Sequence, residues 1–415
     1  MSILIQMGRK ARMAAGELAC LGEDEKNAAI LAIADAVESS AEEIIAANEK
    51  DLDSARRDGL GKAMLDRLTL TNERVLAMSK AVRDCALVPD PVGKTLGSRT
   101  RPNGLQITKV AVPLGVVGII YESRPNVTVD CAVICLKAGN ACILRGGKEA
   151  INSNAALVRI MRDALLNLQI NPDAFQLVED TSRESAGEMM RLDNYIDVLI
   201  PRGGHELIRT VIENSTVPVI ETGAGVCHAY VDEHADITMA ADIIHNGKTS
   251  RPSVCNSLEC ILVDRKVAGE FLPLIRTRLS KPYVELRGCP KTCEILGQGA
   301  LPATEKDFGA EFLDYIMAVR VVEDIGQAIE HIKRYSSRHS EVIITRDTQR
   351  AAYFSQRVDS AAVYINASTR FTDGGEFGLG AEVGISTQKL HARGPMGVGE
   401  LVSYKYLIEG DGQIR

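Results

Sequence analysis

Cysteine is the residue type best suited to nucleophilic chemistry in this 415-residue chain, which contains ten cysteines. Cys255 has the most suggestive neighbours, because Lys248 and Arg251 precede it in HNGKTSRPSVC and Pro252 disfavours a regular helix there. Nearby cations stabilise the thiolate, which is the nucleophilic form of the side chain. Burial as a small hydrophobic residue is the commoner fate of a cysteine, so the residues alone leave both interpretations of Cys255 open.

The other cysteines fit structural roles better. Cys289 and Cys293 form a C-x-x-x-C pair beside Pro290, but no second pair or nearby histidine completes a zinc set, so we predict no metal site. Hydrophobic patterns predict core packing for five more: Cys20, Cys85, Cys131, Cys135 and Cys142.

Acyl chemistry at a thiolate would also need a stabiliser for the oxyanion that forms, such as a side-chain amide. Asn126 in YESRPNVT offers one, although an asparagine after a proline in a loop more often satisfies the backbone of a turn. Glu221 begins ETGAG after the strand-like residues VPVI, at a strand end where the sites of α/β sheets gather. We interpret Glu221 as a base, a cofactor contact or a cap.

Two nucleotide-binding motifs are incomplete in the chain. HNGKT, which begins at His245, matches the end of a phosphate-binding loop, but Asp242 stands where the first glycine belongs. GLGAEVG, which begins at Gly378, has the wrong final spacing for the dinucleotide fingerprint. The sequence therefore disfavours a nucleoside triphosphate site and the standard Rossmann mode of cofactor binding.

The composition is typical of a globular protein, with 45% hydrophobic and 25% charged residues. A net charge of 48 − 55 = −7, with scattered basic residues, argues against nucleic acid as a partner. No apolar run approaches the ~18 residues of a membrane helix, and the N-terminus lacks the apolar core of a signal peptide. We therefore expect a soluble, cytoplasmic protein with reduced thiols and no membrane partner.

Hydrophobic periodicity predicts the elements that position these residues. Helical patterns fill residues 24–83, and short apolar runs then alternate with amphipathic stretches from residue 141 to residue 200. A second alternation begins near Cys227 and contains four strand candidates: Cys260–Val263, Tyr315–Val322, Glu341–Thr345 and Ala361–Ile365. This rhythm predicts two α/β domains with parallel sheets. Leu105–Tyr121, with a central Pro-Leu-Gly break, predicts a hairpin-like strand pair.

Four segments taken together resemble gamma-glutamyl phosphate reductases, a branch of the aldehyde dehydrogenase superfamily: YESRPNVT, ETGAG, KTSRPSVCNSLE and EFGLGAEVGISTQKLHARGPMG. Their order matches, and the resemblance covers essentially the whole chain. It implies an aldehyde dehydrogenase-like α/β fold with two parallel-sheet domains and a bridging or oligomerisation hairpin. The implied cofactor-binding domain comprises residues 1–104 and 122–223, the catalytic domain residues 224–395, and the bridging strands residues 105–121 with 401–415.

The resemblance also implies roles for single residues. Cys255 would be the nucleophile, Asn126 the oxyanion-hole amide, and Glu221 would occupy the superfamily's general-base position. In most superfamily members that glutamate activates water, which would be harmful in an enzyme that reduces an acyl group. Three cations in or near the signature segments are candidates for holding the substrate's phosphate or carboxylate, although solvated or structural roles are equally compatible: Lys248, Arg251 and Arg393.

For the cofactor, the resemblance implies NADPH, with NADP as its oxidised form. Arg145 and Lys148 in ILRGGKEA align with the loop that usually holds the adenosine ribose, and Glu311 in EFLDY with the loop that grips the nicotinamide ribose. The usual phosphate-turn glycines are replaced by PRGGHE, in which Gly203 and Gly204 would let the backbone approach a phosphate closely.

The implied activity is the NADPH-dependent reduction of L-glutamyl 5-phosphate to L-glutamate 5-semialdehyde and phosphate, the second step of proline biosynthesis from glutamate. The Cys255 thiolate would displace phosphate, hydride would reduce the thioester, and the thiohemiacetal would collapse to the aldehyde. A homo-oligomer is expected, with glutamate 5-kinase as a partner. The alternatives are a relative that oxidises another aldehyde, one that passes the acyl group to coenzyme A, and a catalytically silent scaffold.

Overall fold

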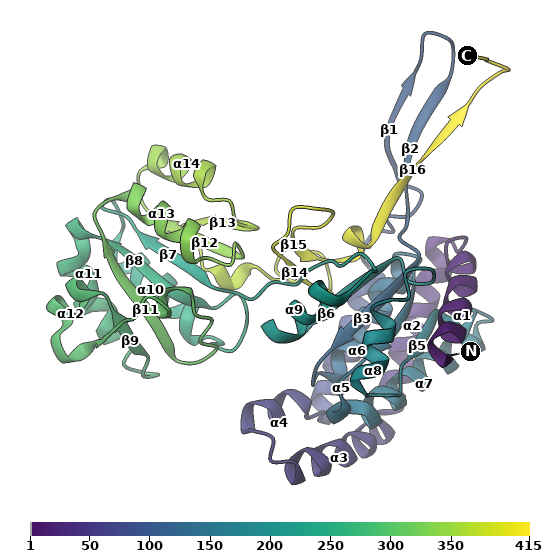
Figure 1. The fold of residues 1–415 in the computed structure, drawn as a ribbon, viewed down its shortest axis with the longest axis horizontal. Coiled ribbons are helices and arrows are strands. Elements are labelled where there is room, and N and C mark those ends of the chain that lie inside the picture. Colours follow the sequence, from purple (N-terminus) through teal and green to yellow (C-terminus); the bar gives the residue numbers. More distant parts are fainter. Residues whose placement is uncertain (1) are drawn as a thin grey trace. The chain divides into compact units, whose positions relative to one another are not determined.

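The computed structural model describes residues 2–415, apart from the side chains at positions 62 and 63. The chain folds into two compact units (Figure 1). Unit 1 comprises Met1–Thr222, Gly378–Gly384 and Met396–Arg415, and unit 2 comprises Gly223–Phe377 and Ile385–Pro395. The chain therefore passes between the units four times, and three of these passages fall in the glycine-rich segment near the C-terminus.

Helices open unit 1, as the sequence predicts. The predicted apolar stripe on the second helix is confirmed, because Ile30, Ile33, Ala34 and Val37 are all buried. The described helices of this unit are α1 (Ile3–Leu18), α2 (Glu23–Ser39), α3 (Ala41–Arg57), α4 (Lys62–Leu68), α5 (Asn72–Ala86), α6 (Pro125–Lys137), α7 (Ile151–Asn167), α8 (Arg183–Met189) and α9 (His205–Asn214).

The four-stranded sheet of unit 1 is parallel, which confirms the predicted βαβ rhythm. Its strand order is β5-β4-β3-β6. The strands are β3 (Val116–Tyr121), β4 (Ala141–Arg145), β5 (Phe175–Leu177) and β6 (Val198–Arg202). β3 is buried at every position, as a central strand covered by helices on both faces must be.

A second sheet of unit 1 is antiparallel and extends as an arm (Figure 1). Its strands are β1 (Thr95–Thr100), β2 (Gln106–Pro113) and β16 (Val402–Glu409), with β2 in the middle. β16 pairs with β2 over eight residues, so the C-terminal strand joins part of the predicted hairpin.

The prediction of a strand pair within Leu105–Tyr121 is wrong, because its two halves lie in different sheets. β2 pairs with β1 and β16, whereas β3 belongs to the parallel sheet. The chain changes direction between β2 and β3 at Gly115, which has φ +120° and donates its N–H to Asn140 Oδ1 at 2.8 Å. A Cβ on Gly115 would lie 2.2 Å from Asp197 Oδ2, so only glycine fits this exit from β2. A proline-glycine break thus marks a change of sheet here, not a tight turn.

Unit 2 is built on a seven-stranded parallel sheet of order β10-β9-β11-β8-β7-β12-β13. Its strands are β7 (Cys227–Val231), β8 (Leu258–Asp264), β9 (Glu285–Gly288), β10 (Leu301–Pro302), β11 (Ile316–Val322), β12 (Ser340–Ile344) and β13 (Ala362–Ile365). The four predicted strand candidates are confirmed as β8, β11, β12 and β13. β9 and the two-residue edge strand β10 lie outside the predicted set.

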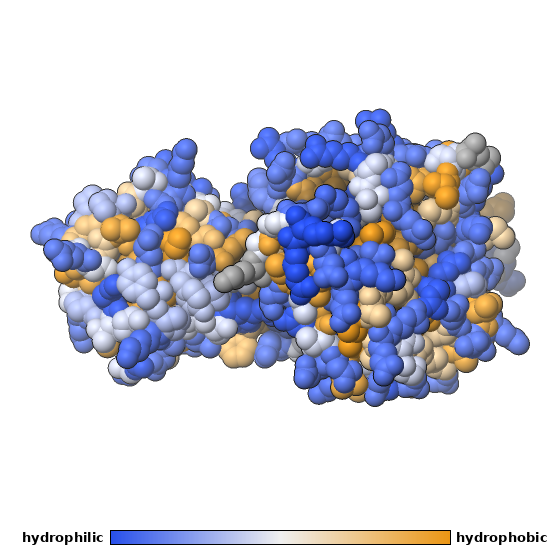
Figure 2. All heavy atoms as spheres, turned by 90° about the horizontal axis from the view of Figure 1, so that it is seen from below, coloured by the Kyte–Doolittle hydropathy of each residue, from blue (hydrophilic) through white to orange (hydrophobic). Residues whose placement is uncertain are grey.

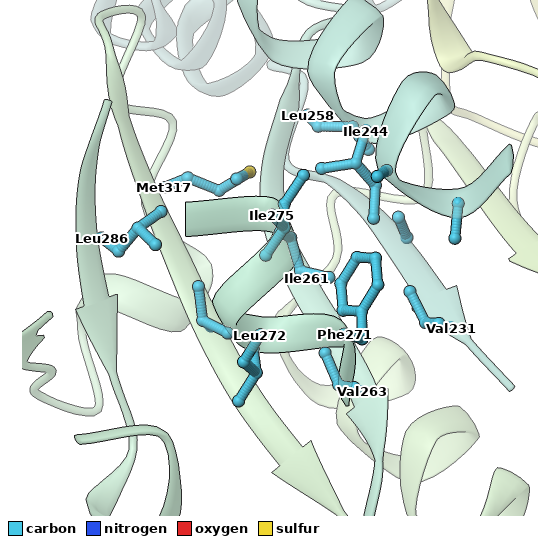
Figure 3. Packing of buried hydrophobic residues seen from close by; sticks show 14 of the residues in the cluster. Val231, Ile244, Leu258, Ile261, Val263, Phe271, Leu272, Ile275, Leu286 and Met317 are labelled. Carbon is cyan, nitrogen blue, oxygen red and sulfur yellow. The ribbon is translucent and has the colours of Figure 1, made fainter. Parts of the chain in front are cut away.

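Hydrophobic clusters fill both faces of this sheet. One cluster contains Ile261 and Val263 of β8 packed against Phe271, Leu272 and Ile275 of a helix (Figure 3). The other contains Cys260 and Leu262 of the same strand, so alternate residues face opposite layers. The helices of unit 2 are α10 (Ile237–Thr249), α11 (Arg265–Arg278), α12 (Pro290–Leu296), α13 (Ile325–Tyr335) and α14 (Thr348–Arg357).

The glycine-rich segment near the C-terminus contains the two-stranded sheet of β14 (Gly384–Ser386) and β15 (Gly394–Met396). Positive φ values at Gly378, Gly380, Gly394 and His391 confirm the predicted special backbone conformations. Every helix of the described residues is too short or too polar to cross a bilayer. On the face drawn in Figure 2, hydrophilic side chains predominate and hydrophobic ones form small separate groups.

Candidate active site

Cys255 lies in the turn that joins α10 to β8 in unit 2, and no helix forms there. The turn closes on itself through the Ser257 N–H, which donates to the Val254 carbonyl at 3.0 Å. The Cys255 side chain is partly exposed, whereas Cys131, Cys135 and Cys142 of unit 1 are buried. Burial raises the pKa of the Cys131 thiol well above its usual range, and a hydrogen bond with Cys142 together with burial does the same for the pKa of Cys135, so these two are poor nucleophiles.

A segment far along the chain fixes this turn. The short helix η5 (Thr369–Phe371) and its flanks bond to Asn256, the residue after Cys255. Thr369 Oγ1 donates to the Asn256 carbonyl at 2.7 Å, and Asn256 Nδ2 donates to the Thr372 carbonyl at 2.9 Å. The Arg370 guanidinium also donates to Asn256 Oδ1, and its Nε donates to Ser250 Oγ at 3.1 Å. Three hydrogen bonds to Asn256 and one to Ser250 therefore fix the turn that carries Cys255.

The other side of the turn rests on the entry to β7. A Cβ on Gly225 would lie 1.4 Å from the Cys255 carbonyl oxygen, so Gly225 permits a direct backbone approach. The Cys227 thiol donates to the same carbonyl at 3.3 Å. Gly225 belongs to ETGAG, so two of the signature segments meet in the structure.

Arg370 supplies a positive charge beside Cys255. Burial lowers the pKa of Arg370 and the charge of Arg251 lowers it further, while a negative charge on Cys255 raises it. The guanidinium and the thiolate therefore lie within electrostatic range, and by the same interaction Arg370 stabilises the thiolate. Sequence reasoning missed Arg370, because it lies 115 positions beyond Cys255 and belongs to no nucleotide or metal motif.

Lys248 lies near this turn but points into the core. Its ammonium donates to Glu259 Oε2 at 2.7 Å, and both side chains are fully buried. Burial lowers the pKa of Lys248 and raises that of Glu259, while the attraction between them opposes both shifts. Lys248 would need an exposed ammonium to hold a substrate phosphate as predicted, and its ammonium is buried.

Two more predicted residues of unit 2 already have protein partners. Arg393 donates from Nη2 to the Asp359 carbonyl at 2.9 Å and lies 2.9 Å from Asp359 Oδ1. Glu311 Oε1 accepts the Gly225 N–H at 2.7 Å, which places this glutamate on the strand entry that supports Cys255. Arg251 is exposed and lies beside Arg370.

In unit 1, Asn126 lies in the first turn of α6, not in a loop as predicted. Pro125 occupies the first helical position, where its missing N–H is not needed, and this starts the helix one residue before Asn126. The exposed amide Nδ2 donates to Asp130 Oδ2 at 2.9 Å. Burial raises the pKa of the Asp130 carboxyl to about 6, although the Asn126 amide and the charge of Arg202 act to lower it.

The predicted adenosine-side residues follow β4. Arg145 donates from Nη2 to the Thr181 carbonyl at 2.7 Å and to the Ser182 carbonyl at 3.0 Å, which holds the loop before α8. Lys148 is exposed, with Nζ 3.5 Å from Asp58 Oδ2. A long surface ion pair of this kind is weak, so Lys148 keeps an ammonium that an added phosphate can attract.

Gly203 and Gly204 form the turn from β6 to α9, with Gly204 as the N-cap. The Glu122 carboxylate occupies this turn: Gly204 N–H donates to Glu122 Oε2 at 2.9 Å, and a Cβ on Gly203 would lie 2.6 Å from the same carboxylate. A helix N-terminus favours an anion, and here a side chain of the protein provides it. Glu221 is half-buried and precedes Thr222, whose hydroxyl donates to the Pro201 carbonyl at 2.6 Å.

Comparison with known proteins identifies the family. The model of the aldehyde dehydrogenase family matches residues 5–288. The chain is 57% identical to a gamma-glutamyl phosphate reductase of Carboxydothermus hydrogenoformans over 415 residues, covering 100% of both chains. A gamma-glutamyl phosphate reductase of Clostridium perfringens is 55% identical, with 99% of both chains covered. The chain belongs to the gamma-glutamyl phosphate reductases of the aldehyde dehydrogenase family.

Solved structures agree with this membership. The crystal structure of a gamma-glutamyl phosphate reductase from Thermotoga maritima superposes with a TM-score of 0.97 at 48% identity, and 100% of both chains is covered. A Rhodopseudomonas palustris propionaldehyde dehydrogenase, at 18% identity and a TM-score of 0.70, shares the fold over 98% of this chain and 97% of its own. The predicted aldehyde dehydrogenase-like fold is confirmed, and the chain is an oxidoreductase of a family that uses nicotinamide cofactors.

Within this gamma-glutamyl phosphate reductase, the structure divides the predicted residues between the units. Unit 2 brings Cys255 together with Arg251 and with Glu311, which binds Gly225 under the turn. Unit 1 carries Asn126, Glu221 and the predicted contacts to the adenosine and phosphate groups. Each half of the predicted site is thus assembled in its own unit.

Proposed function

We propose that this chain reduces L-glutamyl 5-phosphate to L-glutamate 5-semialdehyde with NADPH, releasing phosphate, through a thioester on Cys255. The observation that carries the proposal is the Cys255 turn: a partly exposed thiol beside Arg370, in a chain 57% identical to a named gamma-glutamyl phosphate reductase. This reaction is the second step of proline biosynthesis from glutamate.

In the first step, the Cys255 thiolate attacks the acyl carbon. The carbon–sulfur bond forms, the bond from carbon to the phosphate oxygen breaks, and the electron pair leaves with inorganic phosphate. Arg370 stabilises the thiolate before attack, and the exposed Arg251 is placed to attract the dianionic phosphate. The thioester retains the activation of the acyl phosphate while keeping its carbonyl away from bulk water.

In the second step, the thioester carbonyl accepts hydride, which the reduced nicotinamide supplies when bound. The alkoxide of the thiohemiacetal then expels the Cys255 thiolate and leaves the aldehyde, so the nucleophile is regenerated without a net proton. We assign oxyanion stabilisation to the Asn126 amide, which is exposed and must exchange its bond to Asp130 for the substrate oxygen. Glu221 is proposed as a polar contact of the site, not as a base for water.

For the cofactor, the residues after β4 fit the 2′-phosphate of NADPH. Lys148 presents an exposed ammonium in only a weak pair with Asp58. Arg145 fixes the adjoining loop, and Glu311 would hold the nicotinamide ribose. The turn at Gly203 and Gly204 fits a phosphate only if the Glu122 carboxylate gives way, so we assign the pyrophosphate no contact there.

Regions follow from these roles. We propose cofactor binding for residues 1–104 apart from β1 and for residues 122–223, catalysis for residues 224–395, and subunit contacts for the arm of β1, β2 and β16. The arm exposes the hydrophobic side chains of Leu96, Leu407 and Ile408, which favours a homo-oligomer. The protein would act in the cytoplasm beside a glutamate 5-kinase, because the acyl phosphate that such a kinase makes is short-lived in water.

The test is reduction of NADP in the reverse direction, with glutamate semialdehyde and with or without inorganic phosphate. Reduction that requires phosphate is the expected result, because only phosphate can discharge the thioester to the acyl phosphate. Reduction without phosphate would overturn the proposal and indicate a hydrolytic aldehyde dehydrogenase, and reduction that requires coenzyme A instead would indicate an acylating enzyme. No reduction with phosphate, without phosphate or with coenzyme A would indicate a catalytically silent scaffold.

A further inference from the structure

Three side chains of a metal-binding kind meet in the core of unit 2, and none of them takes part in the proposed chemistry. His228 of β7, Cys260 of β8 and His331 of α13 each offer one ligand atom, and these atoms all lie within 4.8 Å of one another. Their exposed fractions are 0%, 0% and 5%. The cluster lies on the face of the sheet that holds Cys260, whereas Cys227 packs in the opposite layer.

The spacing of these atoms suits zinc. Cys260 Sγ lies 3.7 Å from His331 Nε2. Zinc binds sulfur at about 2.3 Å and imidazole nitrogen at about 2.0 Å, which separates a sulfur and a nitrogen by about 3.6 Å in a tetrahedral site. His228 Nε2 is buried and has no hydrogen-bond partner among the described residues. An unsatisfied imidazole nitrogen next to a thiol and a second imidazole is an arrangement that a bound ion would complete.

The second nitrogen of His228 is already oriented for ligation. His228 Nδ1 lies 3.1 Å from the Val226 carbonyl oxygen and 3.4 Å from Glu341 Oε2, so Nδ1 carries a proton that these oxygens accept, and Nε2 is the nitrogen that a metal would use once its own proton leaves. A histidine that donates one N–H to a carbonyl or carboxylate while its other nitrogen binds the metal is the usual arrangement in zinc sites.

Charge supports the same conclusion. Glu341 is fully buried, and its ion-pair partner is the His228 ring, whose Nδ1 lies 3.4 Å from Glu341 Oε2. Burial acts to lower the pKa of His228, but Cys260 and Glu341 raise it to about 10. The other donors to Glu341 are the His228 backbone N–H at 2.7 Å and the hydroxyls of Ser336 and Ser360. A buried carboxylate needs a compensating positive charge, and without a metal the His228 imidazolium supplies it. A divalent ion on a Cys260 thiolate also carries one net positive charge, so it replaces the charge that His228 loses when its Nε2 proton leaves.

We propose that His228, Cys260 and His331 bind one divalent cation of the zinc class, with the fourth position open to a small ligand such as water. Thiolate and imidazole donors select zinc over magnesium or calcium. Binding releases the Cys260 thiol proton and the Nε2 proton of the His228 imidazolium to solvent. Arg320 Nη1 lies 3.4 Å from His331 Nδ1. When His331 Nε2 binds the ion, Nδ1 carries the ring proton and can no longer accept from Arg320. The Arg320 guanidinium must then turn toward the Phe308 ring, over which it already lies at 5.4 Å.

The site would act on structure, because its strands hold the Cys255 turn. β7 contributes Cys227, whose thiol bonds to the Cys255 carbonyl, and β8 begins three residues after Cys255. An ion that ties His228 to Cys260 would join these two strands through their side chains as well as through their backbone ladder.

Cobalt is the probe for the test, since it replaces zinc and reports thiolate ligation through an intense ultraviolet charge-transfer band. The full-length protein is stripped with a chelator and titrated with Co²⁺ alone, then with Zn²⁺ in competition. We expect one Co²⁺ per chain with the charge-transfer band, and displacement by Zn²⁺. Cys260→Ser should lose the band and weaken binding at least about tenfold, because a serine hydroxyl is a poor ligand for these ions.

Two control variants separate this site from other thiols. Cys142→Ser alters a buried thiol of unit 1, and Cys255→Ser alters the partly exposed one. Both should keep the band. His331→Gln changes the least buried ligand and serves if Cys260→Ser does not fold. A wild-type protein without the band, a band that survives in Cys260→Ser, or an unchanged Co²⁺ affinity in His331→Gln would overturn the proposal.

Discussion

The two units hold their candidate functional groups in different ways. In unit 2 the Cys255 turn is fixed by hydrogen bonds to Asn256 and by direct contact with Gly225, while the thiol stays partly exposed. In unit 1 the candidate groups are engaged with the protein itself: Asn126 with Asp130, and the Gly204 N–H with Glu122. The nucleophile is therefore ready before substrate arrives, whereas the binding groups of unit 1 must exchange partners when a ligand enters.

Because of this difference, mutations in the two units should have different effects on activity. Changes in unit 2 should remove or slow the chemical step, because the reacting atom is positioned there. Changes in unit 1 should act through the exchange of partners, so some of them should improve ligand binding by removing a competitor.

Replacing Cys255 should have the largest effect. Cys255→Ala should bring turnover below detection while NADPH binding and the midpoint of thermal unfolding stay nearly unchanged, because the side chain is partly exposed and its loss opens no cavity. Cys131→Ala is the matched control from unit 1, where the thiol is buried. It should lower the free energy of unfolding by about 1 kcal/mol with turnover retained. Substantial activity in Cys255→Ala would show that Cys255 is not the nucleophile and that unit 2 does not hold the reacting atom there.

Asn126→Ala should lower kcat by about 10²- to 10³-fold, which is the usual cost of losing one oxyanion donor. The KM for substrate should change little, because the amide is needed most in the transition state. Steady-state kinetics provide the measurement, with Asn167→Ala, an exposed asparagine at the end of α7, as control. A rise in KM with kcat unchanged would assign Asn126 to substrate binding instead.

Arg370→Gln should slow alkylation of Cys255 by iodoacetamide about tenfold near pH 7, because the thiolate loses about 1.4 kcal/mol of stabilisation from the nearby charge. The rate plotted against pH should shift to higher pH, since the alkylation rate follows the thiolate fraction. Arg357→Gln removes an exposed guanidinium that lies over Tyr353 and should leave the profile unchanged. An unshifted profile in Arg370→Gln would limit Arg370 to fixing the turn.

Glu122→Gln should have the smallest effect and the opposite sign. It removes the negative charge at the start of α9, so NADPH should bind a few-fold more tightly if a cofactor phosphate approaches Gly204. Isothermal titration of the protein with NADPH is the measurement. Glu184→Gln, in the first turn of α8, is the control and should leave affinity unchanged. Weaker binding in Glu122→Gln would show that the carboxylate supports the cofactor site.

Much of the fold could be predicted from the sequence, because period and punctuation are local signals. The stripe of Ile30, Ile33 and Val37 predicted α2, and the apolar runs predicted the central strands β8, β11 and β12. The wrong hairpin in Leu105–Tyr121 has a physical cause. A break at Gly115 is compatible with a turn or with a change of sheet, and the choice depends on Asn140 and Asp197, which are distant in the sequence.

The site was predictable only where short segments carry it. Cys255 and Asn126 stand in such segments, but the helix that begins at Pro125 was missed. Charged residues were harder to assign, because the sequence shows which residues are near along the chain but not where their side chains point. Lys248 was chosen because it is near Cys255 in the sequence, but its side chain points to Glu259. Arg370 and the cluster of His228, Cys260 and His331 come from separate segments, so no spacing could have indicated them.

The central claim is the covalent bond to Cys255, and the most direct measurement is mass spectrometry of the intact protein mixed with glutamate semialdehyde and NADP in phosphate-free buffer. The account expects a burst of about one NADPH per chain and a glutamyl adduct on the peptide that contains Cys255, because the thioester forms and cannot be discharged. Adding phosphate should remove the adduct and start turnover, and Cys255→Ala should show neither. A protein that turns over with phosphate but forms no adduct in its absence, or an adduct on another cysteine, would contradict a thioester on Cys255.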